Sequence, residues 1–221
     1  MKEIIKELSL KAEFIFVTGI SFGYFILGSV IYFFAPYQAK VTGNHLWFLV
    51  FYEPIILCIV YWFLKQREWS FDKLNINPSL KSTVYGFLLA VISYIAYYLV
   101  YVIAYIIFPN TVTSMNQPLV DGSQINLLNI LAVTIINPFF EELLVVGYVI
   151  TTLKSVKSES FAINISVAIR LAYHLYQGPL AAFSIIPMGL IFGYWYVKKE
   201  NLWSLIVAHA AMDFVGLSLH Q

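Results

Sequence analysis

The sequence is dominated by long apolar runs, each about the length of a helix that crosses a membrane. Such a helix needs roughly 20 mainly apolar residues. A β-barrel would need short segments of alternating polarity, which the sequence lacks. We therefore predict an all-α polytopic membrane protein with about seven transmembrane helices and a polar intramembrane cavity. The predicted spans are about Phe14–Phe34, Leu46–Leu64, Val84–Phe108, Leu127–Leu153, Ser160–Tyr176, Leu180–Val197 and Leu202–Leu219.

Composition supports this class and excludes others. The chain has 221 residues, of which 60% are hydrophobic and 11% charged, whereas soluble domains are roughly one-quarter charged. With a net charge of +1 and no basic patch, a nucleic-acid partner is not expected. The one cysteine, Cys58, cannot form an internal disulfide. No repeat or linker divides the chain, so residues 1–221 are predicted to form a single membrane domain.

Lysines and arginines lie in alternate loops and predict the orientation. The loop between Pro109 and Asn126 has neither residue type. By the positive-inside rule the N-terminus is cytoplasmic and the C-terminus external. Lys40 is the exception. Small size and a bias to Ile, Lys, Asn and Tyr favour a bacterial plasma membrane. The basic residues that set this orientation are Lys65, Arg67, Lys73, Lys81, Lys154, Lys157, Lys198 and Lys199.

Ionisable residues inside the apolar segments are the candidate functional residues, because such residues are costly in a membrane and usually face a protein interior. Residues four apart share a helix face, which pairs two of them in the fifth segment and two in the seventh. The two adjacent carboxylates in the fourth segment are about 100° apart and should differ in role. The residues are Glu141 and Glu142, Arg170 and His174, and His209 and Asp213.

This residue set is suited to hydrolysis. A partly desolvated carboxylate is a general base for an attacking water, and a histidine can orient that water or protonate a leaving amine. A His–Asp pair can stabilise an oxyanion. The same side chains are also zinc ligands, and a metal would be held by Glu141, His174 and His209. The His-Glu-x-x-His spacing of zinc proteases is absent.

Three motifs together resemble the type II CAAX protease family, also called the CPBP or Abi family of intramembrane endopeptidases. Glu141 and Glu142 match the start of its Glu-Glu-x-x-x-Arg signature, and His174 matches the histidine of Phe-x-x-x-His. His209 and Asp213 match a histidine followed four residues later by Asn or a similar residue. The resemblance covers about residues 127–217.

The resemblance implies a function and a role for each residue. Glu141 would activate water with support from Glu142, His174 would assist, and His209 with Asp213 would stabilise the oxyanion. Family members cleave prenylated CAAX proteins, process bacteriocin-like or signalling peptides, or confer self-immunity. The cofactor is left open between a divalent metal such as zinc and none. The expected partners are membrane lipid and a peptide or membrane-associated protein substrate, with the oligomeric state not predicted.

The chain departs from the family signature at two positions. Val146 replaces the signature Arg, and Arg170 replaces the signature Phe. An unpaired buried charge on Glu142 is costly, so we hypothesise that Arg170 packs against Glu142 in place of the missing Arg. The alternative is that losing the Arg marks a non-catalytic member.

Three functions remain in view. The first is an intramembrane endopeptidase, and the second is a non-enzymatic immunity or partner-binding protein of the same fold. The third is a small transporter with Glu53 and Glu141 as proton sites. For Glu53, which precedes Pro54, a hydrogen-bonded neutral carboxyl at a helix kink is favoured over a proton or substrate contact.

Overall fold

The computed structural model describes residues 2–34, 41–109, 121 and 125–219, and it is all-helical. Its main elements are α1 (Lys2–Glu7), α2 (Leu10–Phe34), α3 (Gly43–Gln66), η1 (Phe71–Leu74), α4 (Leu80–Ile107), α6 (Leu127–Glu141), η3 (Glu142–Tyr148), α7 (Val149–Lys154), α8 (Glu159–His174), η4 (Leu175–Gln177), α9 (Pro179–Lys199) and α10 (Trp203–Ser218).

Four helices in the described part of the chain are long and apolar enough to cross a membrane: α2, α3, α4 and the continuous run α6–η3–α7. The class of integral helical membrane protein is therefore confirmed, and the number of spans that length and composition support is four rather than seven. Helices α8 and α10 have 16 residues each, about 24 Å, which is shorter than the roughly 30 Å hydrocarbon core. That α8, α9 and α10 cross the membrane stays a prediction.

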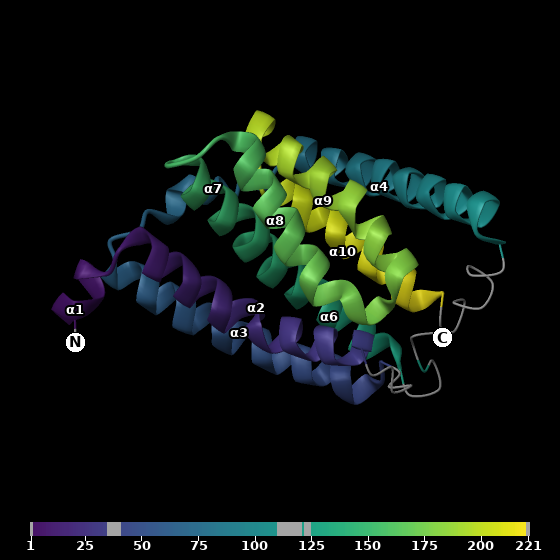
Figure 1. Ribbon diagram of the computed structural model, residues 1–221, viewed down its shortest axis with the longest axis horizontal. Coiled ribbons are helices and arrows are strands. Elements are labelled where there is room, and N and C mark those ends of the chain that lie inside the picture. The colour runs from purple at the N-terminus through teal and green to yellow at the C-terminus, as the bar shows by residue number, and fades with distance from the viewer. Residues whose placement is uncertain (1, 35–40, 110–120, 122–124, 220–221) are drawn as a thin grey trace.

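The helices form three layers (Figure 1). The pair α2 and α3 makes one outer layer, α6, α7 and α8 lie in the middle, and α9, α10 and α4 make the other outer layer. The middle layer is covered on both sides, because α2 packs on α8 and α3 on α6, while α10 packs on α6 and α9 on α8. Helices α6 and α8 are consequently the most enclosed, which explains why their polar residues are buried.

Local sequence signals set the ends of several helices. Ser79 accepts a hydrogen bond from the Ser82 amide at 3.1 Å before α4, and Asn126 accepts one from the Asn129 amide at 3.0 Å before α6. The third residue returns the bond in both cases, which is the capping-box arrangement. Ser158 caps α8 in the simpler way. These caps fix where α4, α6 and α8 begin.

Glycines allow α4 and α9 to approach their neighbours closely, as small residues do between membrane helices. A Cβ on Gly86 of α4 would lie 2.6 Å from the Cβ of Val207 and 2.8 Å from the Ser204 carbonyl oxygen. A Cβ on Gly193 of α9 would lie 2.8 Å from Cγ2 of Ile163. The contact of α4 with α10 and that of α9 with α8 therefore depend on the absence of a side chain at Gly86 and at Gly193.

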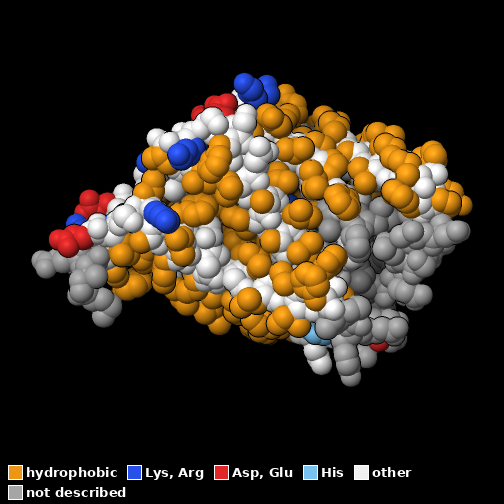
Figure 2. Space-filling view, viewed as in Figure 1, with side chains coloured by type: hydrophobic (Ala, Val, Ile, Leu, Met, Phe, Trp, Pro, Cys, Tyr) orange, Lys and Arg blue, Asp and Glu red, His pale blue; other side chains and the backbone are white. Residues whose placement is uncertain are grey.

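Charge separates the two ends of the molecule. The Lys and Arg side chains visible in Figure 2 lie toward the end of the molecule that carries α1 and the last residues of α7. The rest of the described surface in this view is mainly apolar. At this end Lys6 pairs with Glu68, and Lys154 pairs with Glu200 at 3.2 Å. The apolar body is the surface that a membrane would cover, with the basic end in water.

Candidate active site

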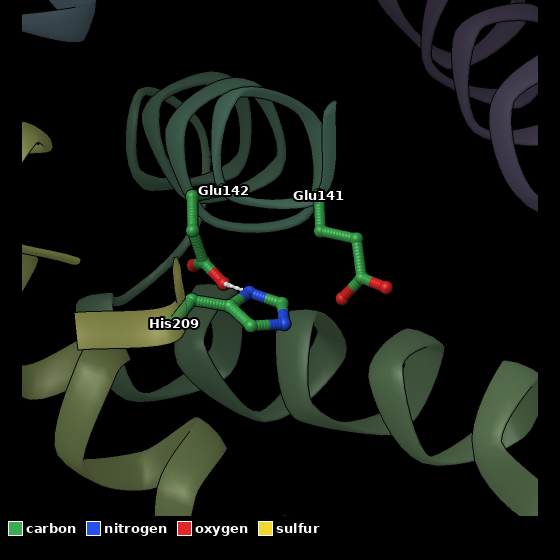
Figure 3. A group of neighbouring side chains, drawn as sticks. All are labelled: Glu141, Glu142 and His209. Atoms are coloured by element: carbon green, nitrogen blue, oxygen red, sulfur yellow. Dashed lines mark hydrogen bonds and ion pairs between the residues drawn. The ribbon is translucent and has the colours of Figure 1, made fainter. Parts of the chain in front are cut away.

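The adjacent carboxylates lie where the long middle helix changes its winding. Helix α6 ends at Glu141, and residues 142–148 form the π-helical segment η3 before the α-helix resumes. Single π turns within α-helices occur frequently at functional sites. Glu141 is 7% exposed and Glu142 is fully buried. Figure 3 shows both side chains leaving this helix, with the ring of His209 between them. Both carboxylates therefore belong to one site.

Two features hold the π-helical segment against its neighbours. The Ser166 hydroxyl of α8 donates a hydrogen bond to the Val145 carbonyl at 2.5 Å. Gly147 faces Leu74, where an added Cβ would lie 2.7 Å from the Cδ2 atom. The segment is thus tied to α8 on one side and packed against η1 on another.

Glu142 is neutralised by two buried partners from different helices. Nη2 of Arg170 lies 2.7 and 2.8 Å from the two Glu142 oxygens, and Nδ1 of His209 lies 2.7 Å from Oε1. The Arg170 side chain is fully buried and its guanidinium lies 5.8 Å from the centre of the Phe192 ring. Charge-assisted bonds of this kind are the strong ones, and they link α6–η3, α8 and α10.

Glu141 has a different environment. The Tyr173 hydroxyl donates to its Oε2 at 2.5 Å, and Nη1 of Arg170 lies 3.4 Å from the same oxygen. Among the described residues, both hydrogen bonds to this carboxylate reach Oε2. Oε1 is therefore the oxygen that a water molecule can approach.

Tyr173 is a site residue that sequence reasoning missed. It lies three residues after Arg170 and therefore on the same face of α8, which is the signal that identifies it in retrospect. Phe22 of α2 stacks on its ring, with centroids 5.1 Å apart and the planes inclined by 7°. The outer helix α2 thus helps to hold the hydroxyl against Glu141.

His209 and Asp213 lie on one face of α10, as their spacing predicts. Nε2 of His209 lies 3.4 Å from Oδ1 of Asp213, and the Asn137 amide donates to Oδ2 at 3.2 Å. Both ring nitrogens of His209 therefore face carboxylates, those of Glu142 and Asp213. A protonated ring would pair with both carboxylates, through a hydrogen bond to Glu142 and a longer contact with Asp213.

His174 lies at the end of α8, and among the described residues one of its ring nitrogens, Nδ1, has a hydrogen-bond partner. Its Nδ1 is 2.9 Å from the Arg170 carbonyl, which can only accept, so Nδ1 carries the proton and Nε2 is the acceptor. The α-helix ends here and a short 3-10 turn follows at Leu175–Gln177. The predicted fifth span, which ran to Tyr176, therefore extended beyond the end of α8. His174 is the last residue of that helix.

The predicted metal ligands can be compared with the groups that the structure brings together. The described group whose potential ligand atoms lie within 4.8 Å of one another is Glu141, Glu142 and His209, whereas the sequence proposed Glu141, His174 and His209. Catalytic zinc sites use three protein ligands. In this geometry Arg170 and His209 already occupy Glu142, and both His209 nitrogens face carboxylates. The arranged residues Glu141, Glu142 and His209 therefore do not fit a metal.

A cavity of about 220 Å³ lies elsewhere, at the basic end of the molecule. The side chains around Glu141 are almost fully buried. The intramembrane cavity that the sequence predicts there therefore stays a prediction. The residues that line the cavity at the basic end are Ser79, Lys81, Ser82, Tyr85, Trp195, Lys199, Asn201 and Ser204.

Fold and site together define a helical membrane protein whose middle layer encloses a carboxylate, arginine and histidine group. Residues 123–215 match the family model for type II CAAX prenyl endopeptidase Rce1-like proteins. This stretch, which holds α6 to α10 up to residue 215, is a domain of that family, as its motifs predict. No curated protein and no solved structure shows a significant match to the chain.

Proposed function

We propose that this protein is an intramembrane peptide hydrolase in which Glu141 activates the attacking water. The observation that carries the proposal is the contrast between the two adjacent carboxylates. Glu142 is held by Arg170 and His209, whereas within the described part of the chain the hydrogen bonds to Glu141 all reach Oε2. The carboxylate with a free oxygen is the one that can take a proton.

The neighbouring residues supply the rest of the chemistry. Water held by Oε1 of Glu141 and by Nε2 of His174 loses a proton to Glu141 as its oxygen attacks the scissile carbonyl carbon. The tetrahedral oxyanion that forms is stabilised by hydrogen-bond donors of the site. His209 is the principal donor: its Nε2–H, which lies 3.4 Å from Asp213, turns to the oxyanion, while Nδ1 stays on Glu142 and Asp213 keeps the ring oriented. Tyr173 fixes the orientation of Glu141.

Arg170 supports this proposal because it supplies the positive charge that Val146 does not. Val146 is fully buried within the apolar core, and Arg170 reaches Glu142 from the facing helix. We propose that this relocated arginine serves the site as the signature arginine would. The loss of the signature residue is then compatible with an active enzyme.

The substrate class that we propose is a peptide anchored at the membrane by a lipid, in particular a prenylated cysteine followed by three residues. This rests on the family that residues 123–215 match and on the apolar surface of the molecule. Bacteriocin-like and signalling peptides are the other membrane-associated candidates. We also propose a bacterial plasma membrane, with the N-terminus in the cytoplasm.

A non-enzymatic immunity or partner-binding role is the second candidate, favoured by the closed state of the site. Glu141 and His209 are 7% and 5% exposed, so a substrate must displace side chains to reach them. A binding scaffold would need no such opening.

The test is cleavage of a fluorogenic peptide with a farnesylated cysteine before its last three residues, by purified protein in lipid nanodiscs. We expect Glu141→Gln to abolish cleavage and to leave the unfolding temperature close to that of the wild type. Glu159→Gln, which changes an exposed carboxylate at the start of α8, is the matched control and should cleave normally. Equal activity in the Glu141→Gln variant would contradict the assignment of the base.

A further inference from the structure

A buried acidic side chain outside the family domain lies beside the site. Glu53 belongs to α3, is 1% exposed, and precedes residues 123–215, which match the family model. Helix α3 packs on α6, which carries Glu141 at its end. A carboxyl group in such a place, at the level of a membrane, is a functional-site candidate by default.

Glu53 lacks the hydrogen bond expected of a helix-kink residue. Its Oε2 is buried and has no hydrogen-bond partner among the described residues. The neighbouring Pro54 lies inside α3 and has no N–H to donate to the helical hydrogen-bond pattern. The kink explanation, which requires a hydrogen-bonded carboxyl, therefore leaves Oε2 unexplained.

The charges that act on Glu53 are those of the site. They come from Glu141 on α6 and from His209 and Asp213 on α10. A further unpaired anion beside two carboxylates in a dry interior would be strongly unfavourable. The neutral carboxylic acid is the form that the site accommodates, and its Oε2 meets no acceptor among the described residues.

The proposed reaction has so far assigned no residue to protonation of the leaving group. When the peptide C–N bond breaks, the departing amine nitrogen needs a proton. Arg170 is committed to Glu142, and the Tyr173 hydroxyl already donates to Glu141. His209 keeps Nδ1 on Glu142, and its Nε2–H serves the oxyanion.

We propose that Glu53 is a catalytic acid of this site and donates its proton to the leaving amine nitrogen. The inference rests on the proposed function. Water gives one proton to Glu141 as its oxygen bonds to the carbonyl carbon. The C–N bond then breaks, the nitrogen takes the proton of Glu53, and the carbonyl reforms. The proton on Glu141 finally passes to Glu53 and restores both groups, so that one water is consumed for each bond.

The leaving group distinguishes this role from others. The farnesylated peptide has an amine leaving group that needs a proton, whereas the p-nitrophenyl ester of N-acetyl-farnesylcysteine releases p-nitrophenolate, which does not. For Glu53→Gln, which preserves size, we expect peptide cleavage to fall by about a hundredfold or more. Ester hydrolysis should stay close to the wild-type rate. Glu159→Gln should change neither rate, and Glu141→Gln should abolish both.

Other outcomes overturn the inference. Wild-type peptide cleavage by Glu53→Gln would show that Glu141 itself returns the proton, and the proposed function would survive. An equal fall in the rates of peptide and ester cleavage would show that Glu53 maintains the structure of the site and does not protonate the leaving group. Absence of Glu141-dependent cleavage in the wild type would remove the proposed function, and the acid role with it.

A second measurement does not depend on any substrate. The infrared spectrum of the wild type at neutral pH should contain a protonated carboxyl band that shifts in D₂O and is missing in Glu53→Gln. If the two spectra agree in this region, Glu53 holds no proton to donate and the inference fails. The unfolding temperature of the variant, measured on the same samples, shows whether it is folded.

Discussion

At the scale of single residues, the site depends on one guanidinium group. Arg170 is fully buried and contacts both carboxylates, at 2.7 and 2.8 Å from Glu142 and at 3.4 Å from Glu141. Removing one member of a buried ion pair costs roughly 3–5 kcal/mol, because the partner stays buried and unpaired. Arg170 therefore stabilises the fold and the charge of the site together.

Substituting Arg170 with lysine tests the geometry of this pair. A lysine keeps the charge but replaces the planar fork by a single ammonium group, so one or both carboxylates lose a partner. We expect Arg170→Lys to lower the unfolding temperature and to reduce peptide cleavage at least tenfold, with Arg170→Met worse in both. Cleavage by the lysine variant at the wild-type rate would show that charge alone suffices.

The double substitution of Val146→Arg with Arg170→Phe tests whether the arginine has been relocated. It returns both positions to the family signature, so the variant should fold and cleave the peptide. Val146→Arg alone should unfold readily, because it adds a second cation to a core position that is fully buried. An inserted and folded double variant with no activity would contradict the relocation hypothesis.

Sequence reasoning identified some site residues because they are rare in their surroundings. Only 11% of the chain is charged, so Glu141, Glu142 and Arg170 stand out from an apolar background. Tyr173 does not, because it is one of 16 tyrosines in the chain. Its role depends on the hydrogen bond between its hydroxyl on α8 and Glu141 on α6. The spacing of residues within one sequence does not predict such a contact between two helices.

At the scale of elements, the predictable part was the existence of each helix, and the unpredictable part was its winding. All seven predicted segments contain helix. The π-helical segment at 142–148 was not foreseen, since an apolar run of this composition is equally compatible with a regular α-helix. Four of the predicted segments form helices that are long and apolar enough to span. Spanning by α8, α9 and α10 stays a prediction, and α8 and α10 have only 16 residues each.

Close packing of α4 on α10 is the element-scale feature most open to test. We expect Gly86→Ala to destabilise the protein by about 1–3 kcal/mol, the usual cost of overpacking, since the new Cβ would lie 2.6 Å from Val207. Thermal unfolding in detergent measures the effect. Gly28→Ala in α2, where a Cβ meets nothing within 4 Å, is the control and should not destabilise. Equal unfolding temperatures for all three proteins would argue against this packing.

At the scale of the whole molecule, the helices that precede the family domain complete the site. Helix α3 brings Glu53, and α2 brings Phe22 against Tyr173. Helix α2 also brings Glu13, which accepts hydrogen bonds from Arg67 at 2.8 Å and from Tyr148, the last residue of η3, at 3.2 Å. From hydropathy, these helices could be predicted only as membrane spans. Their contacts with the site depend on how the layers pack together.

The basic end of the molecule predicts its orientation in the membrane. In a Cys58→Ala background, we expect a membrane-impermeant thiol reagent to label Asn126→Cys in intact cells. Lys157→Cys should be labelled only after the cells are opened, because the basic loops remain in the cytoplasm. Both positions are exposed. The reverse labelling pattern would place the N-terminus outside.

The most direct test of Glu141 as the base of a membrane peptidase compares peptides from living cells. Mass spectrometry is applied to membrane and secreted peptides from cells that contain equal amounts of the wild type or of Glu141→Ala. We predict fragments that are present with the wild type and missing with the variant, and their ends would identify the substrate. Identical peptide profiles would contradict the proposed function and favour a binding or immunity protein.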